Sequence, residues 1–577
     1  MLYRLKDKYF ILSMISLVLF FVIFTGLIKL QVVDSKEYLA KSTSYLSTTE
    51  IIPAPRGKIL DRYGRPIVTN RLGFSVSFVR ASVSDDELND LILNTVTLFD
   101  KNDEEYTDTF PIQYTDGEYI FGYNDLSGDE LDTKVRNCKF SLGISDNLNA
   151  NQCINSLIEK FGIDSRYSKE EIRDIIAIRY EMNSRNFSDT TPFTISSDVS
   201  IKSVSAIEEN EALYDGLKVS NSPVRNYVHG NMAAHILGRV DIIYREEYEE
   251  LKDEGYGLNS VIGKDGIEKI LEKQIKGTDG YRRVSQIVGS DPEVDEVAAI
   301  AGNNAMLTID IDLQRTAEKA LMETIESIKA NSWKQNDNVG SDVGGGAVVV
   351  QDVETGEILA MASYPDFNPD TFTKDFNTLS KDESKPLLNR AISGVYPPGS
   401  VFKMLTTVAA LEENVVTDTT VIEDKGVYEY YDQKFNCWIY TEKNETHGPM
   451  DAANALKNSC NYYYYEVARR LGVDKLVEYG KKFHLGEKTG IELEGEAMGT
   501  LASEEFKKRN FNEVWYPGDT LQMAIGQSYN LFTPLQLAGY TASIANRGTI
   551  YRPHITKCIR DSRTGNIVDE TENKVNS

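Results

Sequence analysis

The sequence has few cysteines, few histidines and a shortage of basic residues. Its five cysteines are sparse and odd in number, which excludes a disulfide framework as the main stabilising device. The 62 Lys and Arg residues are outnumbered by 88 Asp and Glu residues, which gives a formal net charge of −26. Such a chain repels phosphate backbones, so its composition argues against nucleic acid as a partner.

Low-complexity tracts, internal repeats and long linkers are also absent. Hydrophobic residues make up 41% of the 577 residues and charged residues 26%. This balance is ordinary for folded proteins and excludes general disorder. At about 100 to 200 residues per domain, the length predicts about three domains.

Long apolar runs are confined to one segment near the amino terminus. Tyr9–Ile28 is a run of 20 residues without a charged side chain, enough to cross about 30 Å of hydrocarbon. Basic residues precede it (Arg4, Lys6 and Lys8), and the positive-inside tendency keeps them in the cytoplasm. A cleaved signal peptide is the alternative, but no small-residue cleavage site follows. The sequence therefore predicts a single-pass anchor in the cytoplasmic membrane, with the bulk of the chain outside.

The region that follows, residues 30–300, mixes short strands with helices. It contains an acidic insertion at about residues 82–221, in which apolar spacing predicts helices over Asp85–Phe99 and Lys169–Arg185. No catalytic pattern is found in the insertion.

From about residue 301 to residue 577 the pattern changes to that of an α/β domain. Apolar residues at helical spacing predict a helix over Asp312–Lys329. Gly346–Ser363 then reads as a β-hairpin, two apolar runs joined by a turn that contains Gly356.

The most informative motif is Ser400-x-x-Lys403, which follows two prolines and a glycine. The stiff turn ends at Ser400, and apolar residues then recur at helical spacing: Val401, Leu405, Val408 and Leu411. Ser400 and Lys403 thus lie one helical turn apart on the same face. A buried lysine with a lowered pKa can remove the proton of a serine nucleophile. The alternative is that Ser400 merely caps the helix.

A second motif, Ser459-Cys460-Asn461, lies between two helical segments at residues 452–457 and 462–471. Alone it is a common polar triplet. Its order and distance after Ser400, however, match the Ser-x-x-Lys and Ser-x-Asn arrangement of penicillin-interacting enzymes.

With these motifs the sequence resembles the class B penicillin-binding proteins, which are monofunctional peptidoglycan D,D-transpeptidases, and among them the elongation-type penicillin-binding protein 2 group. Three further segments carry the resemblance: Arg56–Arg62, Ile262–Lys269 and Leu307–Asp310. One small departure is Val228, where related chains often carry proline.

The resemblance implies an architecture of three parts. Residues 1–29 would form the cytoplasmic tail and transmembrane anchor, and residues 30–300 a mixed α+β extracytoplasmic pedestal of the dimerisation type. Residues 301–577 would form a serine transpeptidase domain, in which helices flank an antiparallel sheet.

The resemblance also implies roles for four residues. Ser400 would attack the penultimate D-Ala carbonyl of a stem pentapeptide, and an amine of a neighbouring stem would complete the crosslink. Lys403 would be the general base, Ser459 would pass a proton to the leaving amine, and Asn461 would hold Lys403 and the substrate backbone. Beta-lactams would acylate the same serine. No cofactor is required, and a multi-spanning glycosyltransferase is the implied partner.

The third motif of this family, Lys-Thr-Gly on a core strand, is not found where it is expected. Lys488-Thr489-Gly490 follows the Ser-x-Asn helix too closely and reads as a surface loop, and Arg563-Thr564-Gly565 reads as a hairpin turn. The motif should follow the segment ending at Pro553, so the chain is expected to be truncated at its carboxy terminus, without some core strands of the domain.

Four further residues suggest a metal site. Cys437, His447 and Cys460 fall close together, and Asp432 lies just upstream. Two thiolates, an imidazole and a carboxylate form an acceptable tetrahedral zinc set. A Cys437–Cys460 disulfide, or a buried cysteine beside a turn histidine, are the alternatives; Cys138 and Cys153 are a further candidate pair.

Other functions fit the sequence less well. A carboxypeptidase or beta-lactamase would not need the long pedestal, and a bifunctional class A enzyme would carry a glycosyltransferase domain in its place. No histidine is followed by Glu, which excludes a His-Glu-x-x-His sensor protease. An inactive scaffold of a cell-wall synthesis complex stays open because the third motif is missing, and so does a septal or sporulation role.

Overall fold

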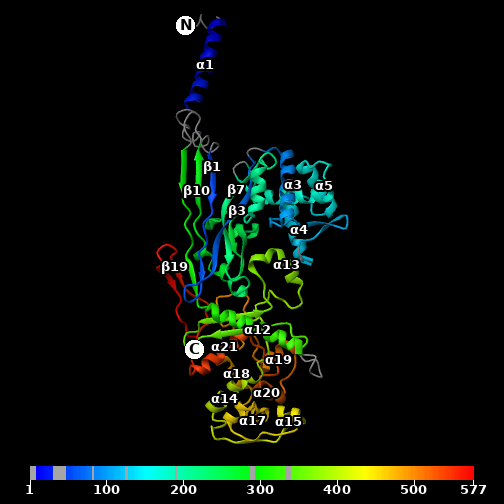
Figure 1. Ribbon diagram of the computed structural model, residues 1–577, viewed down its shortest axis with the longest axis vertical. Coiled ribbons are helices and arrows are strands. Elements are labelled where there is room, and N and C mark those ends of the chain that lie inside the picture. Colours follow the sequence, from blue (N-terminus) through cyan, green and yellow to red (C-terminus); the bar gives the residue numbers. More distant parts are fainter. Residues whose placement is uncertain are drawn as a thin grey trace.

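The computed structural model describes residues 8–29, 47–80, 83–123, 126, 128–188, 191–285, 293–331 and 340–576. The molecule is elongated (Figure 1), with helix α1 (Lys8–Ile28) at one end and a helical lobe at the other. Next to α1 along the long axis lies an antiparallel three-stranded sheet of β1 (Ser47–Ile52), β10 (Gly280–Ser285) and β11 (Glu293–Val297).

Among the described residues, no helix combines the length and hydropathy needed to cross a membrane. The anchor expected at Tyr9–Ile28 therefore stays a prediction.

A seven-stranded sheet joins distant parts of the sequence. Its order is β20-β19-β12-β2-β3-β6, with β7 also paired to β3. The strands are β2 (Ile59–Leu60), β3 (Pro66–Phe78), β6 (Phe193–Ser196), β7 (Leu217–Tyr227), β12 (Asn304–Leu307), β19 (Thr556–Arg560) and β20 (Ile567–Glu570). Because β12 lies between β2 and β19, the amino-terminal region and the carboxy-terminal segment share one sheet.

A buried ion network links strand β7 to the segment before β2 and to helix α10 (Gly266–Ile270). The fully buried Glu268 accepts hydrogen bonds from Arg56 at 2.8 Å and Arg225 at 2.7 Å. Removing one partner from such a network typically costs about 3–5 kcal/mol. Gly57 is required beside it, because a Cβ there would lie 1.7 Å from the carbonyl oxygen of Asn303.

The acidic insertion folds around its own hydrophobic core at the side of the molecule (Figure 1). Its main helices are α3 (Asp85–Asn102), α4 (Gly128–Leu142), α5 (Ala150–Phe161) and α6 (Lys169–Ser184). The predicted helices over residues 85–99 and 169–185 are confirmed as α3 and α6. Each begins at a serine capping box, Ser84 with Glu87 and Ser168 with Glu171.

The α/β region begins with helix α12 (Ile311–Asn331) and the antiparallel hairpin of β13 (Gly346–Gln351) and β14 (Ile358–Tyr364). Both predicted elements are confirmed. Helix α12 packs on β14, and α21 (Pro534–Ala545) packs on β13. Within the described residues this sheet has two strands, with helices against it.

The helical lobe at the far end from α1 carries the two motifs. Its helices are η7 (Gly399–Phe402), α14 (Lys403–Glu412), α15 (Trp438–Lys443), α16 (Ala452–Lys457), α17 (Asn461–Leu471), α18 (Val473–Lys482), α19 (Glu504–Phe511) and α20 (Pro517–Ala524). Helix α17 packs on α14 and α20 around a core that contains Phe402, Tyr463 and Tyr464. The helix expected from Ser400 onward starts as a 3-10 turn, because the N–H of Lys403 bonds to the carbonyl of Ser400, and becomes α-helical at Lys403.

Candidate active site

Ser400 and Lys403 lie side by side at the start of this helix, but in opposite environments. Ser400 is exposed, whereas Lys403 has an exposed fraction of only 1%. The turn that presents Ser400 is fixed from behind, since the N–H of Gly399 donates to the carbonyl of Gly526 at 3.0 Å. The nucleophile candidate thus faces solvent while its candidate base is held inside the protein.

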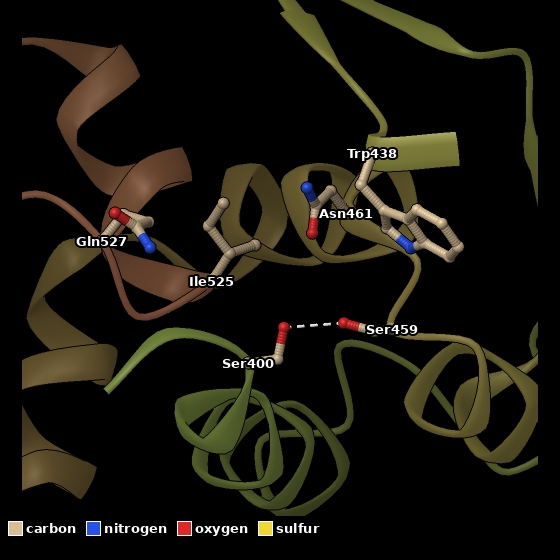
Figure 2. A pocket seen from close by; sticks show the side chains of 6 residues that line it. All are labelled: Ser400, Trp438, Ser459, Asn461, Ile525 and Gln527. Atoms are coloured by element: carbon tan, nitrogen blue, oxygen red, sulfur yellow. Dashed lines mark hydrogen bonds between the residues drawn. The ribbon is translucent and has the colours of Figure 1, made fainter. Parts of the chain in front are cut away.

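A hydrogen-bond network joins the two motifs. Ser400 Oγ lies 2.7 Å from Ser459 Oγ (Figure 2). Lys403 Nζ lies 2.9 Å from Ser459 Oγ and donates to the Ser459 carbonyl at 2.9 Å and to Asn461 Oδ1 at 2.6 Å. Within the described residues, Ser400 and Lys403 are connected through Ser459 rather than by a direct hydrogen bond.

Ser459 reaches this position through an unusual backbone conformation. It connects α16 to α17 with a φ of 51°, in the left-handed region that costs a non-glycine residue about 1 kcal/mol or more. The conformation turns both the Ser459 carbonyl and its hydroxyl toward Lys403. Asn461 is the first residue of α17. The start of this one helix therefore positions the groups of Ser459 and Asn461 that contact Lys403.

The electrostatics of the site favour a neutral lysine. Burial lowers the pKa of Lys403 from 10.5 to about 8, and the neighbouring Cys460 and Cys437 oppose this shift. A neutral amine is a base. The same burial that hides Lys403 from water therefore makes it able to accept a proton near neutral pH.

A pocket opens in front of Ser400. Its lining residues are Ser400, Trp438, Ser459, Asn461, Ile525 and Gln527 (Figure 2). Sequence reasoning did not identify Trp438, Ile525 and Gln527. The only local signals were Trp438 directly after Cys437 and the turn-forming Gly526 before Gln527.

The structure brings together three of the four expected metal ligands and replaces the fourth. Ligand atoms of Asp424, Cys437, His447 and Cys460 all lie within 4.8 Å of one another. His447 Nδ1 is 2.7 Å from Asp424 Oδ2, and Cys460 Sγ is 3.5 Å from the same oxygen. Asp424 and Cys460 are 2% and 0% exposed, so this is a buried group of four potential ligands.

Asp432 does not belong to this group. It lies exposed in the turn between β16 (Val427–Tyr430) and β17 (Gln433–Asn436). Asp424 takes its place because β15 (Ile422–Asp424) pairs with β18 (Gly448–Met450), which sets Asp424 opposite the residue after His447. The prediction of Asp432 as the fourth ligand was therefore wrong. It was chosen because it lies close to Cys437 in the sequence, which gives no information about the β15–β18 pairing.

The cysteines are all free thiols in the structure, and all five are described and buried. Neither Cys437–Cys460 nor Cys138–Cys153 forms a disulfide.

The two Lys-Thr-Gly-like segments lie away from the pocket. Lys488 is exposed, and Thr489 donates through both its N–H and its hydroxyl to Glu496 at 2.6 Å. These contacts define a loop rather than a core strand. The segment 563–565 forms the turn between β19 and β20.

Comparisons with known proteins match both regions of the chain. Residues 51–307 match the penicillin-binding protein dimerisation domain, and residues 346–577 match the penicillin-binding protein transpeptidase domain. The chain belongs to the class B penicillin-binding proteins. This confirms the family predicted from the two motifs, and the family is one of peptidoglycan D,D-transpeptidases.

Curated relatives point to the penicillin-binding protein 2 group within this family. The peptidoglycan D,D-transpeptidase MrdA of Haemophilus influenzae is 29% identical over 553 residues, which cover 93% of this chain and 70% of the relative. MrdA of Escherichia coli strain K12 is 31% identical over 399 residues, which cover 66% of this chain and 58% of the relative. The elongation-type group predicted from the sequence is confirmed.

A solved structure supports the same fold. A chain from the structure "Structural coordination of polymerization and crosslinking by a peptidoglycan synthase complex" has 27% sequence identity and a TM-score of 0.60. The match covers 99% of this chain and 82% of that one.

Proposed function

We propose that this class B penicillin-binding protein crosslinks peptidoglycan stem peptides through an acyl-enzyme on Ser400. The observation that supports this most strongly is the continuous contact from Ser400 Oγ through Ser459 Oγ to the buried Lys403 Nζ, at 2.7 and 2.9 Å. The nucleophile Ser400 and the proton carrier Ser459 thereby line one pocket, and the base Lys403 lies buried behind Ser459.

The arrangement suggests how the proton moves in acylation. A neutral Lys403 has two N–H bonds and one lone pair, so it donates to the Ser459 carbonyl and Asn461 Oδ1 and accepts from the Ser459 hydroxyl. Ser459 in turn accepts from the Ser400 hydroxyl. As Ser400 Oγ attacks the penultimate D-Ala carbonyl, its proton passes to Ser459, and the Ser459 proton passes to Lys403.

Collapse of the tetrahedral intermediate breaks the peptide bond to the terminal D-Ala. The leaving amine takes a proton back along the same route, from Ser459, which is restored by protonated Lys403. In the second half-reaction the amine of a neighbouring stem attacks the Ser400 ester and forms the new peptide bond. The proton that the attacking amine loses is passed through Ser459 and Lys403 to Ser400 Oγ, and Ser400 is released as the free hydroxyl.

Covalent labelling tests this function. A fluorescent penicillin should form a band that survives denaturing electrophoresis and that disappears after prior incubation with unlabelled benzylpenicillin. Protein denatured before the addition should not label. A native protein that stays unlabelled at saturating penicillin would refute the proposed acyl-enzyme chemistry.

The pKa of Lys403 predicts the pH dependence of acylation. Because the active form is the neutral amine and the pKa is about 8, the rate constant should rise about tenfold per pH unit below that value and level off above it. Stopped-flow or quench measurements between pH 6 and 9 check this. A rate constant independent of pH across that range would contradict the role of Lys403 as the base.

We also propose that Asp424, Cys437, His447 and Cys460 hold one zinc ion next to the Ser-x-Asn motif. The support is the chemistry of the four buried donors within 4.8 Å of one another. Cys460 lies between Ser459 and Asn461, so the ion would brace the segment that contacts Lys403.

Elemental analysis of protein purified without a metal-affinity step should find about one zinc per chain. Cys437→Ser and Asp424→Asn should lose most of it, whereas Asp432→Asn, a matched control on the exposed turn, should keep it. Equal loss in Asp432→Asn, or a metal-free native protein, would count against the site.

We also propose that Tyr9–Ile28 crosses the cytoplasmic membrane once and that most of the chain lies on its extracytoplasmic side. The support is the run of 20 uncharged residues after a basic flank. Protease added to wall-stripped cells should digest the bulk and leave an amino-terminal tag intact. Protection of the bulk would contradict this orientation.

A peptidoglycan polymerase is the proposed partner. The solved relative comes from a complex described as coordinating polymerization and crosslinking, which supports a glycosyltransferase beside this chain in the membrane. Crosslinking would then follow strand synthesis at one place.

A further inference from the structure

Tyr540 is a buried residue of helix α21 whose hydroxyl group has no part in the proposed chemistry. Its side chain has an exposed fraction of only 1%, and its ring meets the ring of Phe483 edge to face at 5.1 Å. The hydroxyl accepts a hydrogen bond from the N–H of Leu405 at 2.8 Å and donates one to the carbonyl of Val401 at 3.1 Å. The residue directly after Ser400 is therefore bonded to a side chain of another helix.

These two backbone groups are a pair that an α-helix joins directly, since each N–H bonds to the carbonyl four residues before it. In this chain the helix is a 3-10 turn as far as Phe402 and becomes α-helical at Lys403. A side chain that inserts into the hydrogen-bond ladder is a known cause of a local change in helix geometry. The Tyr540 hydroxyl thus supplies both hydrogen-bond partners at the point where one helix form passes into the other.

The 3-10 form of this turn matters for the contact between the two motifs. With about three residues per turn, side chains at i and i+3 lie directly above one another, whereas in an α-helix they are about 60° apart around the axis. Ser400 and Lys403 are such a pair, and both contact the Ser459 hydroxyl, at 2.7 and 2.9 Å. A change of the turn to the α form would therefore move Ser400 relative to Lys403 and to their shared partner.

Helix α21 also holds the chain on the other side of Ser400. Phe532, directly before the N-cap of α21, forms a β-bridge with Tyr396 through two backbone hydrogen bonds of 2.9 Å. The rings of Phe532 and Phe402 stack at 6.2 Å, and α21 itself packs on β13. The nucleophile turn is thus bonded before Ser400 by the start of this helix and after it by Tyr540, so its position is set before a substrate binds.

We propose that Tyr540 is a positioning residue, whose hydroxyl keeps the nucleophile turn in its 3-10 form and thereby holds Ser400 Oγ next to the Ser459 hydroxyl. This inference rests on the proposed acyl-enzyme function and adds the group that sets the geometry of the nucleophile. Without the hydroxyl, the N–H of the buried Leu405 would stay unpaired or bond to the Val401 carbonyl. The second outcome extends the α-helix back toward Ser400.

The variant Tyr540→Phe removes the hydroxyl and keeps the ring. Rapid-quench experiments with benzylpenicillin give the acylation rate constant and the amplitude, which counts the correctly folded sites. The rate constant should fall about tenfold, as expected when a group that orients the nucleophile is lost, and the amplitude should stay near about one acyl group per chain. The loss should be equal at about pH 7 and about pH 9, because the change acts on the position of Ser400 and not on the charge of Lys403.

Tyr479→Phe is the matched control. Tyr479 is a buried residue of α18 in the same lobe, and its hydroxyl donates to Glu413 at 3.1 Å. This variant should keep the native rate constant and the native amplitude.

A native rate constant in Tyr540→Phe, with or without a reduced amplitude, would mean that the hydroxyl only stabilises the fold, and would overturn the inference. A loss confined to the lower pH would also overturn it, because the hydroxyl would then act through the pKa of Lys403. Both results leave the proposed function standing. A native protein that benzylpenicillin does not acylate would instead refute the proposed function, and the inference with it.

Discussion

Replacing Ser400 by alanine should abolish covalent labelling by penicillin. The exposed Ser400 hydroxyl is the group from which Ser459 and Lys403 can remove a proton for attack on a carbonyl. Loss of a nucleophile of this type typically costs a factor on the order of 10⁶. The fold should be unaffected, because Ser400 is exposed and its side chain contacts only Ser459 by hydrogen bonding in the described structure. Labelling by fluorescent penicillin and a thermal melt measure the two effects separately.

Ser562→Ala is a suitable control for this experiment. Ser562 lies in the β19–β20 turn and donates to the carbonyl of Ala301. Strand β19 lies outside the helical lobe (Figure 1). It should label like the native protein. Label retained in Ser400→Ala, with a normal melting curve, would mean that another side chain is the nucleophile.

Lys403→Ala should lower the acylation rate constant by a factor of about 10² to 10⁴, the range expected for loss of a general base. Lys403→Arg should not restore it, because a guanidinium does not lose its proton near neutral pH. Rapid-quench kinetics with benzylpenicillin would measure both variants.

Folding must be checked for these two variants, since Lys403 is buried and both Ser459 and Asn461 bond to it. Circular dichroism and a melting temperature serve as the control. If Lys403→Arg kept its structure and acylated at the native rate, the proton would have to leave Ser400 by another route.

Local sequence patterns predicted much of the fold. Helices α3, α6 and α12 and the β13–β14 hairpin could be predicted because their apolar residues recur with the period of the element. The seven-stranded sheet was not predicted. Its pairing of β12 with β2 and β19 joins segments hundreds of residues apart, and short two- to five-residue strands carry little periodic signal.

The site was predicted where chemistry and spacing coincide. The i and i+3 positions of Ser400 and Lys403 place them one helical turn apart, and the family resemblance supplied roles for Ser459 and Asn461. The distances between the two motifs could not be predicted from the sequence. They depend on the left-handed backbone conformation of Ser459 and on the packing of α14 against α17.

Asp424 and Gln527 could not be found from the sequence for related reasons. Asp424 joins its group through the β15–β18 pairing, although it lies 23 positions before His447 in the sequence. Gln527 is placed by the Gly526–Gly399 contact. In both cases the decisive information is a long-range backbone contact rather than a local pattern.

The central claim is that Ser400 carries the acyl group, and peptide mapping tests it most directly. The protein is incubated with benzylpenicillin near pH 8, digested and examined by tandem mass spectrometry. The account predicts one penicilloyl adduct per chain, on the peptide that contains Ser400 and at that residue. An adduct on any other residue, or an unmodified Ser400 peptide from a folded and saturated sample, would contradict it.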